Sequence, residues 1–262
     1  MQDKIKQTLQ QVQVEEQVRI VYACESGSRA WGFPSADSDY DVRFLYVHPR
    51  DWYLAIDLEG RPDVIERPIT DILDVSGWDI RKALQLLRKS NPPLLEWLNS
   101  PIVYQELPAI ADRLRALVPE CYSPIACAHH YLHMARGNYR EYLKNEPIWI
   151  KKYFYVLRPL FAIKWIKEKD SVMPMEFGAL LDQLVVDGEL KTAIAELMEL
   201  KKAGQELDRG ARIPIISEYI ESELKRLETE LASLKAPKPA TEKLNDVFRY
   251  SLTFSQDVYG GA

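Results

Sequence analysis

The sequence has few cysteines and no long apolar run. Its three cysteines, Cys24, Cys121 and Cys127, form no CxxC pair. Such a scattered set argues against a disulfide framework and against a thiolate zinc site. No stretch of about 18 uncharged apolar residues occurs, and the N-terminal segment is polar. We therefore expect a cytoplasmic protein that does not enter a membrane.

An excess of positive charge is also missing. The chain has 262 residues with 34 basic and 39 acidic side chains, which gives a net charge of −5. This balance argues against a protein that coats nucleic acid through bulk charge, so any polyanion must be bound by a local group of cations. With 47% hydrophobic residues, the composition is that of a globular protein with one large domain or two small ones.

Strand and helix patterns alternate in the N-terminal part of the chain. Short β-branched runs bounded by Gly, Pro and Ser predict strands, and a helical pattern begins at Asp79 and stops at Asn91-Pro-Pro. The predicted strands are 18–24, 39–47, 64–69 and 72–76. We expect a mixed-sheet domain over residues 1–115.

Strand patterns disappear in the C-terminal part, where apolar residues recur at helical intervals between Pro, Gly and charged turns. The predicted helices are 123–144, 147–169, 175–186, 190–206 and 214–235. We expect an all-helical domain over 116–262 that binds substrate or nucleotide, and hence an α+β protein.

The densest polar constellation joins a Gly-Ser turn to two nearby acids. Gly27 and Ser28 follow the first strand, and Asp39 and Asp41 open the next. Residues two apart in a strand project to the same face, so the two carboxylates would lie side by side. Mg²⁺ suits such a pair and completes its shell with water and phosphate oxygens, while amides of the turn and Arg29 would favour phosphate.

These motifs resemble a known family. Gly27-Ser-Arg-Ala-Trp-Gly32 with Ser38-Asp-Tyr-Asp41 is similar to the active-site signature of the DNA polymerase beta superfamily of nucleotidyltransferases. With four further motifs, the chain resembles the stand-alone bacterial branch described as predicted nucleotidyltransferases or as the RNA-repair-pathway DNA polymerase beta family. These motifs are Gly77-Trp-Asp-Ile-Arg-Lys82, Lys89-Ser-Asn-Pro92, Glu96-Trp97 and Ser100-Pro101. The resemblance is specific over about residues 20–105, and Lys151–Arg158 is the most family-like stretch of the helical half.

The resemblance implies a polymerase beta-like palm domain that transfers a nucleoside monophosphate from an NTP to a hydroxyl. It implies two Mg²⁺ ions, with Mn²⁺ as a substitute, held by three carboxylates. By this carry-over Gly27 and Ser28 contact the triphosphate, with Ser38 beside them in the signature. Asp39 and Asp41 then bind both ions.

The third carboxylate has three candidates. Asp74 lies between apolar residues in a predicted strand, which is the usual setting for this role in the family. Asp79 competes with it, although a position just before a helix also suits an N-cap. Glu66 is the third candidate. If none of them faces Asp39 and Asp41, the chain would bind nucleotide without catalysing transfer.

Further cations are candidates for nucleotide contact. Arg43 follows Asp41 by two residues and shares its face in a regular strand. Lys152 and Arg158 belong to a mixture of cations and aromatics that suits triphosphate or base contact, and packing against the first domain is the alternative. His129 and His133 are four apart on a helix, but without a third ligand they do not predict zinc.

The acceptor and the alternatives remain open in the sequence. The family resemblance favours an RNA 3′ end, and a protein hydroxyl or a small molecule would also fit. One alternative is a protein-modifying, AMP-transferring, antitoxin-like enzyme. Another is a catalytically silent module that binds a nucleotide or a partner. The NTP and the oligomeric state leave no readable trace.

Overall fold

The computed structural model describes residues 1–70, 72–205, 207–232, 234 and 241–254. It divides into two compact units, each of which is built from separate segments of the chain. The sheet unit comprises Met1–Gly27, Asp39–Tyr122 and the described part of Lys238–Ala262, and the helical unit comprises Ser28–Ser38 and the described part of Ser123–Pro237.

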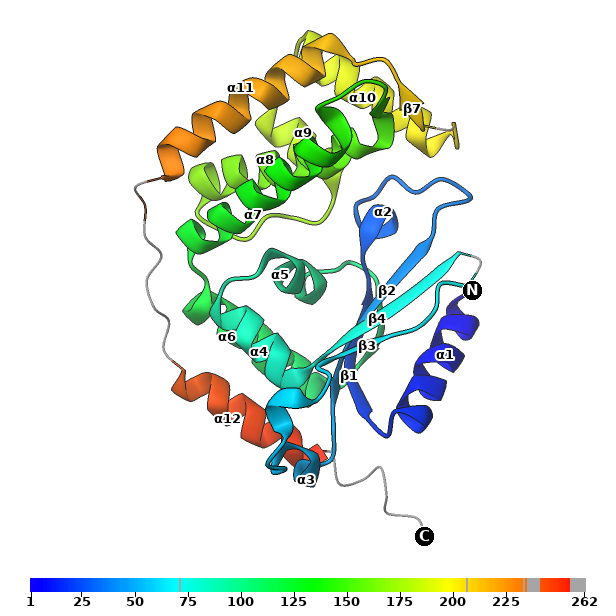
Figure 1. Ribbon diagram of the computed structural model, residues 1–262, viewed down its shortest axis with the longest axis vertical. Helices are drawn as coiled ribbons and strands as arrows, with labels where there is room; N and C mark the ends of the chain where they lie inside the picture. The colour runs from blue at the N-terminus through cyan, green and yellow to red at the C-terminus, as the bar shows by residue number, and fades with distance from the viewer. Residues whose placement is uncertain (71, 206, 233, 235–240, 255–262) are drawn as a thin grey trace. The chain divides into compact units, whose positions relative to one another are not determined.

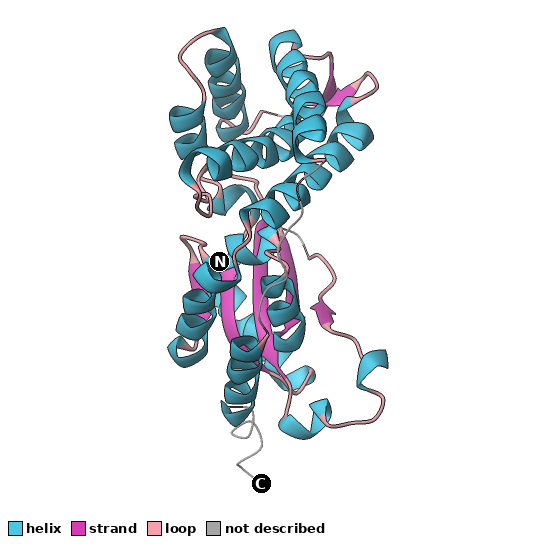
Figure 2. Ribbon diagram, turned by 90° about the vertical axis from the view of Figure 1, so that its left-hand side faces the viewer, coloured by secondary structure: helices cyan, strands magenta, loops and turns pink. Residues whose placement is uncertain are grey.

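A mixed sheet forms the centre of the sheet unit and is drawn in magenta in Figure 2. Its order is β3-β4-β2-β1-β5, and only β2 and β4 pair in parallel among these strands. The strands are β1 (Arg19–Glu25), β2 (Tyr40–Val47), β3 (Val64–Glu66), β4 (Leu73–Asp79) and β5 (Val103–Glu106). Most of them are rich in β-branched and aromatic residues, which suit a buried pleated surface.

Side-chain alternation gives the sheet two different faces. Val42, Phe44 and Tyr46 of β2 share one face, which packs against the buried stripe of α1 (Gln2–Glu15). Figure 1 shows α1 on one side of the sheet and α4, α5 and α6 on the other. These helices are α4 (Ile80–Arg88), α5 (Pro92–Leu98) and α6 (Pro108–Cys121).

A helix from the far end of the described chain completes the sheet unit. It is α12 (Glu242–Ser251), followed by the 3-10 turn η4 (Leu252–Phe254), and it packs on α4 and α6. Phe248 of α12 meets Tyr53 edge to face, with ring centroids 5.1 Å apart. Tyr53 belongs to α3 (Arg50–Tyr53), which precedes the 3-10 turn η1 (Leu58–Gly60).

The helical unit packs its helices around an aromatic core. Phe33, from the inserted segment, contacts Phe154 and Phe177 at centroid distances of 4.7 and 5.6 Å. The helices are α7 (Pro124–Asn138), α8 (Tyr153–Lys169), α9 (Phe177–Leu184), α10 (Glu189–Lys202) and α11 (Pro214–Leu231), with the π-turn η2 (Tyr139–Leu143) and the 3-10 turn η3 (Ile150–Lys152). Its strands are β6 (Ile148–Trp149) and β7 (Arg209–Gly210), and α2 (Gly27–Ala30) begins at the last residue of the preceding sheet segment.

The α+β class is confirmed, with a mixed sheet early in the chain and helices after it. The structure differs from the expected all-helical second half by the two-residue strands β6 and β7, which are too short to leave a sequence pattern. The compact units also differ from the expected 1–115 and 116–262, because the segment 28–38 packs with the helices and α12 packs with the sheet. None of the described helices is long and apolar enough to span a bilayer.

Candidate functional site

Two acids predicted from the sequence lie on neighbouring strands. Asp41 of β2 is paired in parallel register with Asp74 of β4. Because residues paired across a sheet project to the same side, both carboxylates leave the face opposite to the Val42 and Val75 face. Their side chains are 27% and 28% exposed, so a ligand from solvent can reach them.

A single guanidinium bridges the two carboxylates. Nη2 of Arg43 lies 2.7 Å from Oδ2 of Asp74 and 3.3 Å from Oδ1 of Asp41. Its Nη1 donates to the main-chain oxygens of Val42 and Asp74. Two adjacent carboxylates repel each other, and the cation between them offsets that repulsion. Arg43 thus shares the acidic face, as its spacing from Asp41 predicts.

The Gly27 turn lies directly against Asp41. Gly27 has a φ of +59°, which glycine adopts without strain. A Cβ built on Gly27 would lie 2.0 Å from Oδ2 of Asp41, so a side chain at this position would collide with the carboxylate. The Ser26 amide also donates to the Asp41 oxygen at 2.8 Å. The absence of a side chain at position 27 therefore makes room for the Asp41 carboxylate.

Glu25 is a functional-site residue that the sequence reasoning missed. It is fully buried at the end of β1, and its Oε1 accepts the Asp41 amide at 2.8 Å. The Tyr104 hydroxyl donates to the other carboxylate oxygen, and the Ser100 hydroxyl donates to the Glu25 main-chain oxygen at 2.6 Å. An acid that ends an otherwise apolar strand is the signal that could have identified it. Glu25 fixes the backbone from which Asp41 projects.

Asp39 is exposed and lies two residues before Asp41, just outside β2. The amide of the next residue, Tyr40, donates to the Ile72 oxygen at 2.7 Å, which joins this start of β2 to the segment that enters β4. The backbone therefore places Asp39, Asp41 and Asp74 at the same end of the parallel strand pair.

Carboxylate oxygens are the donors that Mg²⁺ prefers, so the chemistry of this acidic face suits a divalent cation. Within the described ranges, however, no group of three or more His, Cys, Asp or Glu side chains is arranged to hold a metal ion. The positive charge between Asp41 and Asp74 is supplied by the Arg43 guanidinium. The type of donor therefore suits a divalent cation, whereas in this arrangement the guanidinium lies between the two carboxylates.

The other two candidates for the third carboxylate lie elsewhere. Asp79 ends β4, pairs in register with Tyr46 and is 1% exposed. It caps α4 by accepting the Arg81 amide at 2.7 Å, and Tyr53 donates to its other oxygen at 2.6 Å. Burial raises the pKa of Asp79 to about 6. Glu66 is exposed on the edge strand β3, opposite Ser76. The structure brings neither acid to Asp41.

Three predicted nucleotide contacts belong to the segment 28–38 of the helical unit. Arg29 donates through Nη2 to the Ser38 oxygen at 2.6 Å. The Ser38 hydroxyl accepts the Ser35 amide at 2.9 Å and is buried. The Ser28 oxygen accepts the Phe33 amide. Arg29 and Ser38 thus help to close this segment on itself.

The last two predicted contacts lie on α8 and just before it. Arg158 is 3% exposed, and its guanidinium carbon is 4.8 Å from the centre of the Trp31 ring. Lys152 is half-buried between the rings of Tyr142 and Tyr155, at 4.4 and 4.2 Å. Both cations therefore lie against aromatic side chains of the helical unit.

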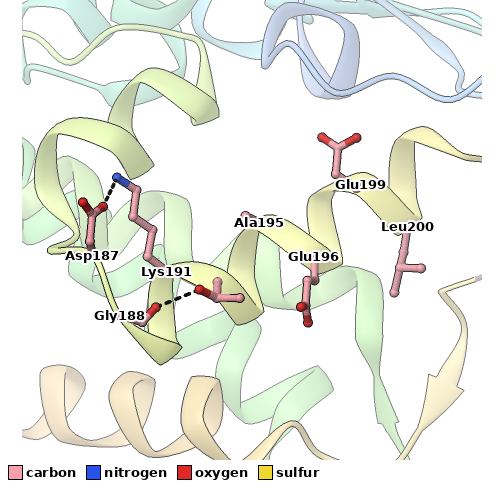
Figure 3. A pocket seen from close by; sticks show the side chains of 8 residues that line it. Asp187, Gly188, Lys191, Ala195, Glu196, Glu199 and Leu200 are labelled. Atoms are coloured by element: carbon pink, nitrogen blue, oxygen red, sulfur yellow. Dashed lines mark hydrogen bonds and ion pairs between the residues drawn. The ribbon is translucent and has the colours of Figure 1, made fainter.

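A hollow of about 730 Å³ on α10 contains none of the predicted residues (Figure 3). Lys191, a cation in its wall, is paired with Asp187 at 2.9 Å and with Asp182 at 3.4 Å. Thr192 donates to the Gly188 oxygen. Because its cation is already neutralised and one helix supplies most of its lining, this hollow adds nothing to the acidic face.

Comparisons with known proteins agree with the family that the motifs resemble. The chain is 50% identical over 246 residues to "Uncharacterized protein YcgL" of Bacillus subtilis (strain 168), and the match covers 94% of each chain. A crystal structure of a nucleotidyltransferase-like protein from Exiguobacterium sibiricum 255-15 is 12% identical, with a TM-score of 0.34, and the match covers 94% of this chain and 80% of that one. Residues 1–250 match the family model for the RNA repair pathway DNA polymerase beta family. The chain belongs to the RNA repair pathway DNA polymerase beta family.

Proposed function

We propose that this protein is a Mg²⁺-dependent nucleotidyltransferase that moves a nucleoside monophosphate from an NTP to the 3′ end of an RNA. Family membership supports the reaction class and the choice of RNA. The observation that carries the proposal is the register of Asp41 and Asp74 on one sheet face, with the Gly27 turn against Asp41. Two neighbouring acids beside a glycine turn suit metal ions and a triphosphate, which supports the proposal.

The proposed reaction is an in-line displacement at the α-phosphorus. The acceptor hydroxyl oxygen bonds to that phosphorus while the bond to the bridging oxygen of the pyrophosphate breaks. Pyrophosphate leaves with that electron pair, and the hydroxyl proton passes to solvent. When bound, Mg²⁺ supplies the positive charge that lowers the barrier for the attacking and leaving oxygens. An α-labelled NTP reports this transfer because the label stays on the acceptor.

The acids and the turn have separate roles. Asp39, Asp41 and Asp74 hold the metal ions, and Gly27 and Ser28 contact the triphosphate. Glu25 is a positioning residue, since it binds the Asp41 amide from a fully buried site. A buried acceptor with several donors holds a backbone more firmly than solvent does.

Arg43 has two possible partners in this proposal. Its guanidinium joins Asp41 to Asp74. If metal ions took those carboxylate oxygens, the fork of donors on Arg43 would suit a phosphate of the NTP.

A silent binding module is the second candidate function. The observation that favours it is the same Arg43 bridge, which places a positive charge between the two acids. Within the described residues, no group of three potential ligands converges. In this case the acidic face would be structural, and NTP would bind without being consumed.

Transfer can be tested directly with purified protein. We would incubate the protein with each of four α-³²P-labelled NTPs, Mg²⁺ and a mixture of RNA and cellular protein, with Asp41→Asn as the control. Label on RNA 3′ ends supports the proposal. Label on protein would assign an AMP-transferring enzyme instead, and no label above the control would favour the silent module.

Metal binding gives a readout that does not depend on activity. We would titrate the protein with Mn²⁺ and follow the signal of the free ion by electron paramagnetic resonance. Wild-type protein should bind Mn²⁺, and Asp74→Asn should weaken binding about tenfold or more. Equal binding by both proteins would remove Asp74 from the ligand set.

A further inference from the structure

The helical unit carries an array of alternating cations and partly exposed aromatic rings. We call it the cation–aromatic array, and no part of the proposed reaction uses it as a whole. Its rings are Trp31, Tyr142, Trp149 and Tyr155, and its cations are Lys151, Lys152, Arg158 and Arg209. All of these residues belong to the helical unit, so the array does not depend on the sheet unit.

One half of the array is centred on Tyr155, which is 41% exposed on α8. Its ring meets Trp31 edge to face, with centroids 5.3 Å apart. The Lys152 ammonium lies 4.2 Å from the centre of the Tyr155 ring and 4.4 Å from that of Tyr142. Burial and the nearby charge of Lys151 lower the pKa of Lys152, while the carboxylate of Glu141 acts in the opposite direction. A phosphate beside Lys152 would add to the effect of Glu141.

The other half is centred on Trp149. Trp149 of β6 pairs with Arg209 of β7, and the Arg209 guanidinium carbon lies 4.9 Å from the Trp149 ring centre. The Lys151 ammonium lies 5.4 Å from the same ring. The Lys151 amide donates to the Leu207 oxygen at 3.0 Å, so the backbone holds the two segments together.

Three of the four cations of the array have no ion-pair partner within the part of the chain that the structure describes. There Lys151, Lys152 and Arg209 form no ion pair with a carboxylate. Other cations of the same unit are paired, such as Lys167 with Glu230 at 2.5 Å and Arg136 with Glu228 at 2.8 Å. In a chain with a net charge of −5, three cations without an ion-pair partner beside aromatic rings form a local surface that suits an anionic ligand.

We propose that the cation–aromatic array binds single-stranded RNA, and that it holds the strand whose 3′ end is the acceptor. Cations that contact phosphates and rings that stack on bases are the two elements of single-strand recognition. An acidic peptide would use the cations but not the rings. This inference rests on the proposed function for the identity of the strand, whereas RNA binding itself does not require transfer. It gives Lys152 a role in acceptor binding rather than in triphosphate contact.

Binding can be measured without Mg²⁺ or NTP. The probe is a 5′-fluorescein RNA of about twelve nucleotides without secondary structure, followed by fluorescence anisotropy over a range of salt concentrations. A hybrid of the same RNA with its complement tests the preference for a single strand. The variants are Lys152→Gln, Arg209→Gln and Tyr155→Ala, with Lys225→Gln as a control because Lys225 is exposed on α11 of the same unit.

The proposal predicts a pattern across these proteins. Lys152→Gln and Arg209→Gln should each weaken binding several-fold and reduce the salt slope by about 0.7 for each lost phosphate contact. Tyr155→Ala should weaken binding about fivefold or more with an unchanged salt slope, because stacking is not ionic. Lys225→Gln should bind like wild type. The single strand should bind at least about tenfold more tightly than the duplex.

Three results would overturn the proposal. Equal affinity for duplex and single strand would show that the array contacts phosphates without stacking on bases. Equal losses of affinity in Lys225→Gln and in the array variants would show that RNA binds through non-specific electrostatic attraction. Displacement of the RNA by ATP at a concentration that saturates the protein would assign the array to the NTP. The Asp41→Asn protein separates the two hypotheses: if wild type and Asp41→Asn both bind RNA and neither transfers label, the proposed function fails and this inference stands.

Discussion

The two acids of β4 end up in opposite environments although five residues separate them. Asp74 is 28% exposed, lies beside Asp41 and is joined to it by Arg43. Asp79 is 1% exposed, caps a helix and receives a hydrogen bond from Tyr53. Both are candidates for the same role by sequence, although the position of Asp79 just before a helical run also suits an N-cap.

Strand geometry explains the difference. An odd separation places the two side chains on opposite faces, and the burial pattern of β4 alternates accordingly. Five residues of strand also extend over roughly 16 Å, far beyond the span of one metal site. Parallel pairing with β2 then determines which acid is useful, since Asp41 is in register with Asp74 and Tyr46 with Asp79. Register, rather than residue type, distinguishes the two acids.

The largest expected effect is a difference in transfer rate between variants of Asp74 and Asp79. Asp74→Asn should reduce nucleotidyl transfer by on the order of 10³-fold, a loss typical of a group that stabilises charge in the transition state. Asp79→Asn should leave the rate within about threefold of wild type, because Asp79 contacts Tyr53 and Arg81 instead. Single-turnover rates with α-labelled NTP check both. Similar losses in the two variants would refute the distinction.

A second change acts on the Asp41 carboxylate through the neighbouring backbone at Gly27. Gly27→Ala places a Cβ in the position of the Asp41 carboxylate and requires a positive φ that alanine adopts with strain. We expect transfer to fall about 10²-fold through misplacement of Asp41. Mn²⁺ affinity should fall with it. The matched control is Gly60→Ala, since a Cβ there meets nothing within 4 Å.

Stability should respond to the buried end of β4 instead. Asp79→Ala removes the α4 cap, which costs about 1 kcal/mol, and leaves the Tyr53 hydroxyl without its acceptor, which costs about 1–3 kcal/mol. Urea unfolding should therefore show a loss of about 2–4 kcal/mol. Asp74→Ala serves as the comparison and should lose less than about 1 kcal/mol, because its ion pair is partly exposed.

The smallest effect is a pH dependence of stability. The pKa of Asp79 is raised from 3.8 to about 6 in the folded protein, chiefly by burial, so the folded state binds its proton more strongly than the unfolded state. Its contribution to stability is therefore complete below about pH 4 and is lost as pH rises through 6. The free energy of unfolding of Asp79→Asn, taken relative to that of wild type, should therefore rise by about 1 kcal/mol between pH 5 and pH 7.5. A difference that stays constant with pH would contradict the shift.

Much of the acidic face around Asp41 could be predicted because the spacing of its residues along one strand is a local feature of the sequence. The Asp-x-Asp spacing and the position of Arg43 two residues later suffice to predict that Asp41 and Arg43 share one face, and the register with β4 keeps Asp74 as a proposed partner. The N-cap alternative for Asp79 is also visible in the sequence, since an acid before a helical run suits a cap. The alternation of side chains along a strand is what places Asp41 and Arg43 on one face.

The remainder depends on contacts between distant segments. Glu25 acts on Asp41 through pairing of β1 with β2, and Tyr104 reaches Glu25 from β5. The spacing of Arg43 shows its face but not that it bridges two strands. The cation–aromatic array joins residue 31 to residues 142–209, a sequence separation that no local pattern encodes.

The interleaved order of segments has a consequence for how the chain is made. The sheet unit includes α12, which lies after the whole helical unit in the chain and packs on α4 and α6. A ribosome therefore releases the segments of the helical unit before the last helix of the sheet unit exists. Since domains fold as units during synthesis, the part of the protein that starts first is the part that finishes last. Until α12 emerges, the sides of α4 and α6 that it covers lack this packing partner.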